Sequence, residues 1–246
     1  MSGNREGYAV NERYIRQESL LGKGGQAALR NSSVFIAGAG GLGSPAAFYL
    51  VSAGLGQIRI ADMDVLELSN MNRQILHTTD RIGMFKAESA KKTLAALDPE
   101  CCVTALPEKI DEDSVRHLVG NADIIVDCMD NFAARYVLNK FAVDEGLPLM
   151  HGAVAGFTGQ ATLVIPGKTP CLSCIFPEVK TTEKTPVLGS TAGVIGSIEA
   201  GEVVKYLTGT GTTLAGKLLL YDGAVNSMET FSVKKSPRCP VCANKK

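Results

Sequence analysis

The sequence has no excess of charge of either sign, no long hydrophobic run and few cysteines. Its 25 basic and 25 acidic residues give a net charge of +0, which argues against the basic surface that nucleic acids and acidic membranes attract. No stretch approaches the ~20 consecutive apolar residues of a membrane span, and the polar N-terminus lacks the apolar core of a secretion signal. Seven cysteines, an odd number, are too few for a disulfide scaffold in a chain of 246 residues. We expect a soluble cytoplasmic protein that binds neither nucleic acid nor membrane.

What the sequence does have is an alternation of strand-like and helix-like segments. Apolar and β-branched runs occupy 33–38, 57–62, 101–106 and 122–130. Segments with helical spacing lie between and after them, at 45–53, 85–97, 111–119 and 132–145. Such alternation is typical of βαβ units. Later apolar runs follow each other closely, at 159–167, 217–222 and 228–233. We predict an α/β fold with a Rossmann-like, mostly parallel sheet, helices on both faces, and an extension of antiparallel strands.

The same patterns indicate a single domain over residues 1–246. An N-terminal helix is expected at 11–30, with Arg13 and Arg16 one turn apart, before a nucleotide-binding core at 31–150. The C-terminal part, 151–246, should contain a last helix at 192–207 that ends at Gly209. A Thr-, Lys- and Pro-rich stretch at 177–191 has neither period, which favours a mobile loop.

A glycine-rich loop follows the first predicted strand and precedes a helix. Gly38, Gly40, Gly41 and Gly43 match G-x-G-x-x-G, a pattern that permits a tight turn and close approach of an anion to the helix N-terminus. Asp62 follows about 20 residues later, where a carboxylate can accept hydrogen bonds from a ribose. The loop therefore predicts an adenosine phosphate. It does not distinguish NAD from ATP.

Charged, amide and hydroxyl side chains near the ends of neighbouring strands favour ATP. They are Asp62, Asp64, Ser69, Asn70, Asn72, Arg73, Gln74, Lys86, Asp130 and Asn131. A nicotinamide ring needs an apolar slot with little charge. A triphosphate under attack needs cations along its oxygens and a carboxylate to hold Mg²⁺, which Arg73, Lys86 and Asp130 supply.

The succession GxGGLG, DxD, SNxxRQ, Lys86 and DCxDN resembles that of the ThiF/MoeB/HesA family, from Arg13 to the last cysteines. The resemblance implies an ATP-dependent adenylyltransferase that activates a small ubiquitin-like sulfur carrier. It implies that Gly41 lies against the nucleotide, Asp62 binds ribose, Asn70 and Arg73 contact phosphates, Lys86 steadies phosphate charge, Asp130 holds Mg²⁺ and Asn131 adjoins the nucleotide. It also implies a homodimer in which Arg16 reaches the triphosphate of the other subunit.

The implied reaction joins the C-terminal carboxylate of a β-grasp protein, typically ending in Gly-Gly, to AMP. A C-terminal carboxylate has a pKa of about 3.5, so it is already ionised at neutral pH and needs no general base. Positioning and charge neutralisation are then the work of the enzyme. We therefore expect His77, His117 and His151 to be structural.

Two C-x-x-C pairs, Cys171 with Cys174 and Cys239 with Cys242, could supply four thiolates to Zn²⁺. A redox-active pair is the alternative that the spacing leaves open. The family resemblance favours a structural zinc site. The remaining cysteines, Cys101, Cys102 and Cys128, fall in strand-like runs, and we expect them to pack as small apolar residues.

The pattern departs from many relatives in the loop before the last helix. Where those proteins carry a further cysteine, this sequence has Thr181 and Thr182, and no cysteine occurs between Cys174 and Cys239. Direct sulfur relay and covalent carrier transfer are therefore in doubt, whereas adenylation needs no thiol. The alternatives are an NAD-dependent oxidoreductase, a non-catalytic nucleotide-binding scaffold and, less well matched, a tRNA-modifying dehydratase of the same superfamily. The sequence does not name the carrier or its pathway, whether thiamine, molybdopterin or another.

Overall fold

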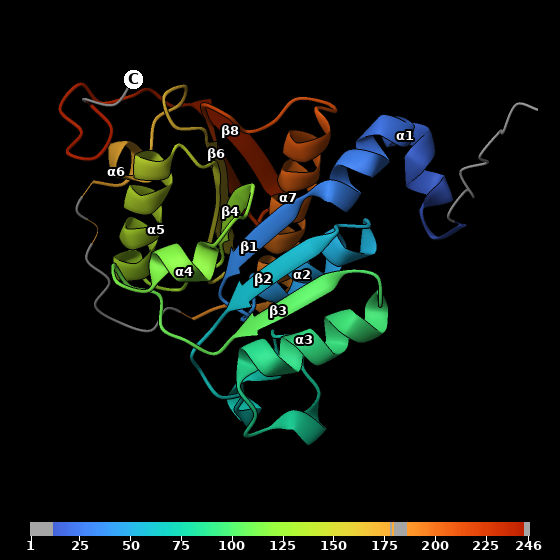
Figure 1. Ribbon diagram of the computed structural model, residues 1–246. Helices are drawn as coiled ribbons and strands as arrows, with labels where there is room; N and C mark the ends of the chain where they lie inside the picture. Colours follow the sequence, from blue (N-terminus) through green and yellow to red (C-terminus); the bar gives the residue numbers. More distant parts are fainter. Residues whose placement is uncertain (1–11, 178, 180–185, 244–246) are drawn as a thin grey trace, which may run out of the picture.

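The computed structural model describes residues 12–177, 179 and 186–243. Within these residues eight strands form one sheet in the order β3-β2-β1-β4-β5-β6-β7-β8 (Figure 1). Their bounds are β1 Ser33–Ala37, β2 Gln57–Ala61, β3 Cys102–Leu106, β4 Ile124–Asp127, β5 Leu149–Ala155, β6 Thr158–Val164, β7 Lys217–Asp222 and β8 Ser227–Ser232. Strands β1 to β5 pair in parallel, and β6, β7 and β8 pair antiparallel. The predicted fold class is confirmed.

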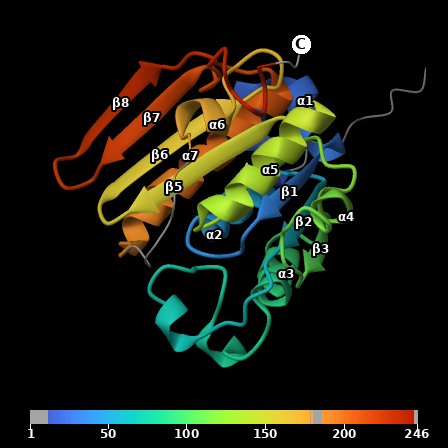
Figure 2. The ribbon, with the colours of Figure 1, turned by 90° about the vertical axis from the view of Figure 1, so that its left-hand side faces the viewer.

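The strand order reverses between β1 and β4. From β1 the chain proceeds to β2 and β3 on one side, and then returns to add β4 and β5 on the other. Ligands in such sheets bind beyond the carboxyl ends of the strands at this switch point. Figure 2 shows the antiparallel strands β6 to β8 continuing the sheet away from it.

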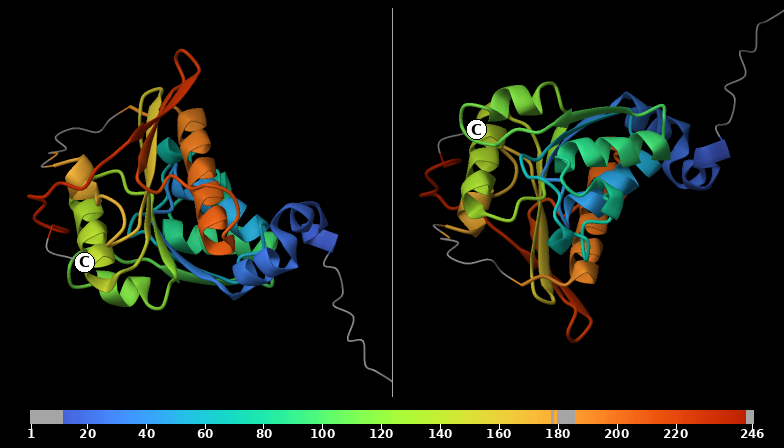
Figure 3. Two further views of the ribbon diagram at one scale, coloured as in Figure 1. Left: turned by 90° about the horizontal axis from the view of Figure 1, so that it is seen from above. Right: turned by 90° about the horizontal axis from the view of Figure 1, so that it is seen from below.

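Helices cover both faces of the sheet (Figure 3). They are α1 Ile15–Asn31, α2 Gly43–Ser52, α3 Lys86–Leu97, α4 Val115–Val119, α5 Phe132–Glu145, α6 Leu172–Ile175 and α7 Gly189–Thr208, with short 3₁₀ helices η1 Glu12–Tyr14, η2 Leu68–Asn70 and η3 Thr79–Arg81. Helices α2, α3 and α7 contribute to one apolar core, and α4, α5 and α6 contribute to the other. Successive residues of β1 alternate between these cores: Val34 and Ile36 enter the first, Phe35 and Ala37 the second.

Two predicted helices need correction, and one strand was missed. The expected N-terminal helix is broken, because Gly22 inside α1 has φ 71° and ψ 165°. The helix expected at 111–119 begins only at Val115, since Asp111 and Ser114 exchange side-chain hydrogen bonds with each other's backbone N–H groups at 3.1 and 2.9 Å and form a turn instead. Strand β5 was not predicted.

Two further expectations concern segments at the limits of the description. The mobile loop predicted at 177–191 lies partly outside the described residues, and Thr181 and Thr182 are outside them; its last residues, 189–191, belong to α7. In the part of the chain that the structure describes, every helix is too short or too polar to cross a membrane.

Candidate functional site

Two of the four loop glycines are required by the backbone itself. Gly38 has a φ of +100°, and a Cβ there would lie 2.8 Å from the carbonyl oxygen of Cys128. A Cβ on Gly43 would lie 1.9 Å from the carbonyl oxygen of Gly38, so the first turn of α2 can pack on the loop only without a side chain. A Cβ on Gly40 or Gly41 would meet only side-chain atoms, at 3.3 Å or more. These two glycines leave the backbone open to a ligand at the N-terminus of α2.

Both polar groups of the Ala39 backbone, within this loop, are held by side chains. Its N–H donates to Asp62 Oδ2 at 2.9 Å, and its carbonyl oxygen lies 2.9 Å from His77 Nε2. Burial raises the pKa of Asp62 and lowers the pKa of His77. The neutral imidazole donates through Nε2, while His77 Nδ1 accepts from the Ser89 hydroxyl at 2.9 Å. Asp62 and His77 thus fix the path of the loop from opposite sides.

Lys86 forms a close pair with Asp64 beside the loop. The Lys86 Nζ lies 2.7 Å from Asp64 Oδ2, and the Lys86 backbone N–H donates to the Asp64 carbonyl oxygen at 2.9 Å. The lysine side chain is only 8% exposed, whereas that of Asp64 is 58% exposed. The ammonium group is therefore fixed in the wall of the site at the start of α3.

The segment after β2 directs amide and guanidinium groups toward the same region. Asn70, at the end of η2, is buried, and its Oδ1 accepts from the backbone N–H of Glu67 at 3.0 Å. The guanidinium group of Arg73 donates through Nη1 to the Ser69 carbonyl oxygen at 3.0 Å and to Asn72 Oδ1 at 2.8 Å. These contacts hold the chain and the Arg73 side chain in one arrangement before any ligand binds.

Gln74 has an unused hydrogen-bonding group in this wall. The residue is buried, and its Oε1 has no hydrogen-bond partner among the described residues. A buried polar atom left without a partner costs about 1–3 kcal/mol. A ligand that donates a hydrogen bond to Oε1 would remove that cost, so Gln74 fits a binding role.

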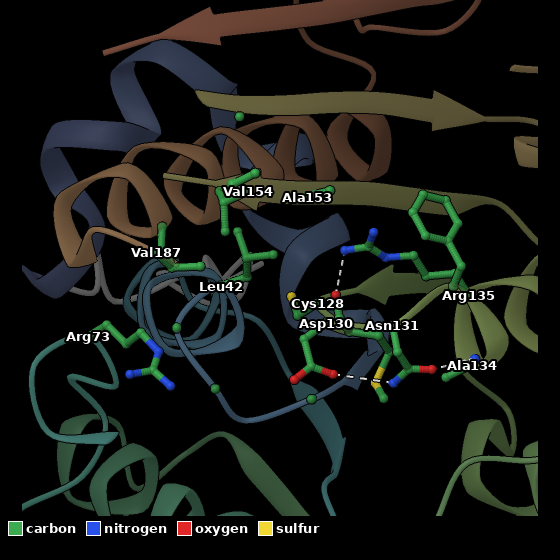
Figure 4. A pocket seen from close by; sticks show the side chains of 18 of the residues that line it. Leu42, Arg73, Cys128, Asp130, Asn131, Ala134, Arg135, Ala153, Val154 and Val187 are labelled. Atoms are coloured by element: carbon green, nitrogen blue, oxygen red, sulfur yellow. Dashed lines mark hydrogen bonds between the residues drawn. The ribbon is translucent and has the colours of Figure 1, made fainter. Parts of the chain in front are cut away.

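At the carboxyl end of β4, Asp130 and Asn131 form the opposite side of the site (Figure 4). Asn131 caps α5, because its Oδ1 accepts from the backbone N–H of Ala134 at 2.9 Å, and its Nδ2 donates to Asp130 Oδ1 at 3.2 Å. The other carboxylate oxygen, Asp130 Oδ2, has no hydrogen-bond partner in the described parts of the chain. A carboxylate oxygen with spare capacity suits Mg²⁺, which prefers oxygen ligands.

These groups share one cavity of about 1970 Å³. In Figure 4, Arg73 and Asp130 extend toward the same region from different elements. The predicted site residues that line the cavity are Gly38, Gly40, Gly41, Asp62, Asp64, Ser69, Asn70, Asn72, Arg73, Gln74, Lys86, Asp130 and Asn131. Gly43 and Arg16 do not line it, because Gly43 is covered by the loop and Arg16 is exposed on α1.

The cavity also continues to residues that sequence reasoning missed. Its lining includes Arg135 and Phe132 on α5, Phe176 after α6, and residues of the antiparallel strands such as Gln160, Tyr221 and Phe231. No motif marks these positions, because they come from α5, from the residue after α6 and from the antiparallel strands, which only the fold brings together. Phe132, Phe176, Tyr221 and Phe231 give this part of the cavity an aromatic lining, and we call it the aromatic groove.

The four cysteines of the two C-x-x-C pairs lie together. Their sulfur atoms are all within 4.8 Å of one another. Cys171 Sγ is 3.5 Å from Cys239 Sγ and Cys174 Sγ is 3.4 Å from Cys242 Sγ, while Cys171 and Cys174 are 4.0 Å apart. Sulfur atoms about 2.3 Å from a central Zn²⁺ in tetrahedral geometry are about 3.8 Å apart. The donor set and its spacing therefore fit a zinc ion.

The cluster is a poorer fit to a redox-active pair. The shortest distances join sulfur atoms of different C-x-x-C pairs, rather than the two sulfurs within one pair. Burial acts to raise the pKa of Cys239, but hydrogen bonds from the backbone of Cys242 and Val241 outweigh it and lower the pKa to about 7, whereas burial raises the pKa of Cys171. The arrangement of the four sulfur atoms, rather than their pKa values, favours a metal.

The chain is similar to several proteins of known class. It is 41% identical over 239 residues to the SAMP-activating enzyme E1 of Haloferax volcanii, covering 94% of this chain and 88% of that protein. It is 40% identical over 246 residues to the sulfur carrier protein adenylyltransferase of Thermus thermophilus, covering 95% and 91%. Identity is also 40% to the adenylyltransferase and sulfurtransferase MOCS3 of Drosophila virilis, of which the match spans 53%.

Solved structures share the fold. The crystal structure of E. coli MccB with ATP superposes with a TM-score of 0.85 at 25% identity, over 98% of this chain and 77% of that one. The microcin C7 biosynthetic enzyme MccB in complex with N-formylated MccA gives a TM-score of 0.87 at 25% identity, over 95% and 75%. The sequence model of the ThiF family matches residues 13–241. This protein therefore belongs to the ThiF family.

Proposed function

We propose that this adenylyltransferase activates the C-terminal glycine of a small ubiquitin-like sulfur-carrier protein. The carboxylate of the carrier attacks the α-phosphorus of ATP, an acyl–AMP bond forms, and the bond to the departing pyrophosphate breaks. Two relatives that are 40–41% identical to this protein over nearly the whole chain are named adenylyltransferase or activating enzyme. Neither an oxidoreductase nor a scaffold role is supported by these relatives.

The observation that carries the proposal is the convergence of opposite charges around the open glycine backbone. Arg73 and Lys86 line the cavity together with the carboxylate of Asp130, beside Gly40 and Gly41. Two cations and an acid at one strand edge suit a triphosphate better than a nicotinamide ring. In the proposed roles, Arg73 and Asn70 contact the phosphates, Lys86 offsets their charge, and Asp62 binds the ribose.

The positions of the three histidines support a reaction that needs no general base. His77 and His151 are buried and outside the cavity lining. His117 is exposed and pairs with Glu108 at 2.8 Å. Since a carrier carboxylate is ionised at neutral pH, the residues of this chain need only align it with the phosphorus and cancel the repulsion between two anions.

We propose that Asp130 holds Mg²⁺ in the ATP-bound protein. Its exposed carboxylate, with one oxygen lacking a partner among the described residues, meets the requirement for an oxygen ligand. When bound, Mg²⁺ neutralises charge on the phosphate oxygens. Asn131 keeps the other oxygen of Asp130 in place from the first turn of α5.

The aromatic groove is proposed to hold the carrier's tail. A Gly-Gly end is narrow, so it can enter the cavity past side chains such as Phe132 and Phe176 and reach the nucleotide end. We further propose that activation stops at the acyl-adenylate, because no cysteine occurs between Cys174 and Cys239. Incubation with the carrier should therefore give no covalent adduct that a reductant releases.

A homodimer is part of the proposal. The outer face formed by α1, α2 and α7 carries a shallow groove of about 440 Å³, beside which Leu20 is 75% and Tyr49 is 56% exposed. A second copy would remove this apolar surface from water. Arg16 is exposed on the same helix as Leu20, so we propose that it reaches the triphosphate in the partner's cavity.

The proposal also includes a zinc site, a single domain and a cytoplasmic location. Cys171, Cys174, Cys239 and Cys242 would hold one Zn²⁺ and fix the last described segment of the chain against α6. The sheet runs without a break from β1 to β8, which supports one adenylation domain over 1–246. A cytoplasmic location remains a prediction.

Exchange of radiolabelled pyrophosphate into ATP tests the proposed function. We expect exchange that requires both Mg²⁺ and a carrier ending in Gly-Gly, since only the reversible adenylation of a carboxylate links the two. The matched control is the same carrier lacking its last glycine, which should support no exchange. Exchange that proceeds equally with this truncated carrier would contradict the proposed substrate.

A further inference from the structure

The backbone of Met129, the residue before Asp130, is held by two buried charged side chains. Its N–H donates to Asp127 Oδ1 at 3.1 Å, and its carbonyl oxygen accepts from Arg135 Nη2 at 2.5 Å. Asp127 is fully buried and Arg135 is 5% exposed. Figure 4 shows Arg135 close to Asp130, with a dashed line at its guanidinium group. The direction in which the chain enters Asp130 is therefore set by two buried side chains, of which Arg135 also lines the cavity.

The same pair is tied to β5 through His151. In the register of β4 with β5, Asp127 and His151 are partners, and His151 Nδ1 lies 2.7 Å from Asp127 Oδ2. Arg135 Nη2 also lies 3.3 Å from the carbonyl oxygen of Gly152, the next residue of β5. Arg135 Nε is 3.7 Å from Asp127 Oδ2. The carboxylate and the guanidinium are thus each held by two elements.

The contacts of the two ring nitrogens fix the tautomer of His151. Asp127 Oδ2, 2.7 Å from His151 Nδ1, accepts, so Nδ1 carries the ring proton and Nε2 is left to accept from the Gln160 amide at 3.3 Å. Burial lowers the pKa of His151 despite the opposing effect of Asp127. A continuous set of contacts therefore runs from Gln160, in the cavity lining, through His151 and Asp127 to the Met129 backbone.

Stability alone does not explain why these charged side chains are buried together. Removing a carboxylate and a guanidinium from water costs free energy that an ion pair often fails to recover, and apolar residues of similar size can be as stable. Here the buried charged groups make directional hydrogen bonds to the backbone of Met129, which is next to the Asp130 carboxylate in the cavity. Residues that hold a metal ligand in place without touching the metal set the orientation of that ligand.

We propose that Asp127, Arg135 and His151 are positioning residues that hold the Met129 backbone and so aim the Asp130 carboxylate at the divalent cation of bound ATP. The inference rests on the proposed role of Asp130. Loss of any one of the three side chains should weaken binding of the divalent cation by about 10-fold or more.

The test compares paired variants by two readouts. His151→Leu removes the donor to Asp127, while His151→Asn keeps an N–H at the position of Nδ1; Arg135→Met removes the donor to Met129, while Arg135→Lys keeps a charged donor. Glu202→Ala is the control for general destabilisation, because Glu202 is buried on α7 outside the cavity and accepts from the backbone N–H of Leu214 at 2.6 Å. The readouts are Mn²⁺ binding in the presence of a non-hydrolysable ATP analogue, followed by electron paramagnetic resonance, and the Mg²⁺ concentration that gives half-maximal pyrophosphate exchange.

We expect His151→Leu and Arg135→Met to weaken Mn²⁺ binding and to raise the required Mg²⁺ by about 10-fold or more, with His151→Asn and Arg135→Lys closer to wild type and Glu202→Ala unchanged. Wild-type cation dependence in His151→Leu and Arg135→Met, or an equal shift in Glu202→Ala, would overturn the inference. If His151→Leu or Arg135→Met does not fold, Asp127→Asn decides the question: wild-type Mn²⁺ binding in this variant overturns the inference, and weakened binding supports it. Mn²⁺ binding needs no carrier, so a wild type that binds Mn²⁺ through Asp130 but performs no exchange would contradict the proposed function alone.

Discussion

The ammonium group of Lys86 lies 2.7 Å from the carboxylate of Asp64 and is the more deeply buried member of the pair, with 8% of its side chain exposed against 58% for Asp64. The pair positions a cation at the edge of the cavity before ATP arrives. A preformed positive charge in a site with little water stabilises developing negative charge without reorganisation.

Replacement of this cation should therefore slow the chemistry. We expect Lys86→Met to reduce carrier-dependent pyrophosphate exchange by about 10²–10³-fold, the usual cost of removing one preorganised electrostatic contact. Lys91→Met is the matched control, since Lys91 is exposed on the same helix and does not line the cavity. Equal rates for the two variants would exclude Lys86 from phosphate contact.

Arg16 should act across the subunit interface. Arg16→Ala and Asp130→Ala are each expected to be inactive, but subunit exchange between them should create dimers with one intact site. Random mixing in equal amounts would restore about a quarter of wild-type exchange, because half of the dimers are mixed and one of their two sites is complete. Mixtures that stay inactive although native mass spectrometry detects mixed dimers would show that Arg16 does not serve the partner's site.

The four-cysteine cluster should contain zinc as purified. Elemental analysis is expected to give about one zinc per chain in the wild type and in Cys102→Ser, whose cysteine is exposed and distant from the cluster. Cys239→Ser should lose the metal and about 4 kcal/mol or more of the free energy of unfolding, in the range of a lost metal site. Full zinc content in Cys239→Ser would contradict the assignment.

Stability should depend on pH through a buried carboxyl group. Glu199 on α7 is fully buried, faces Asp127, Cys128 and Arg135, and has a pKa raised well above 4.5, by burial first and then by the charge of Asp127. The folded state therefore keeps a proton that the unfolded chain releases as the pH rises above 4.5, so the wild type loses stability over that window.

Glu199→Gln imitates the protonated carboxyl and should remove this loss. We expect urea unfolding to show that the variant gains stability relative to wild type as the pH increases from about 5 to about 8. The difference in the free energy of unfolding should grow by no more than about 1.4 kcal/mol per pH unit, the limit for one titrating proton. Parallel stability curves over this range would mean that Glu199 is ionised in the fold.

The parts of the site that sequence predicts are those built from short, contiguous segments. The glycine loop, the segment around Arg73 and the C-x-x-C pairs each have their chemistry within a few residues, so spacing alone indicates what they bind. Spacing alone did not explain Gly43, which was predicted to bind the nucleotide. A glycine is needed there because a Cβ would collide with the Gly38 carbonyl oxygen.

The cluster of Asp127, Arg135 and His151 could not be predicted in this way. His151 becomes a neighbour of Asp127 only through the pairing of β4 with β5, and β5 itself was missed. That strand contains a histidine among small residues and lacks the alternation of a half-exposed strand, because Leu149 to Gly152 are buried on both faces. A buried histidine in a strand makes sense only once its partner, Asp127, is known.

Mass spectrometry of a Gly-Gly-ending carrier after incubation with ATP, Mg²⁺ and this protein tests adenylation most directly. With pyrophosphatase omitted and the reaction quenched rapidly in acid, the carrier should gain the mass of AMP with loss of one water, and Asp130→Ala should leave it unchanged. A carrier that keeps its original mass while the wild-type protein hydrolyses ATP, or that gains a phosphate instead of AMP, would contradict the proposed reaction.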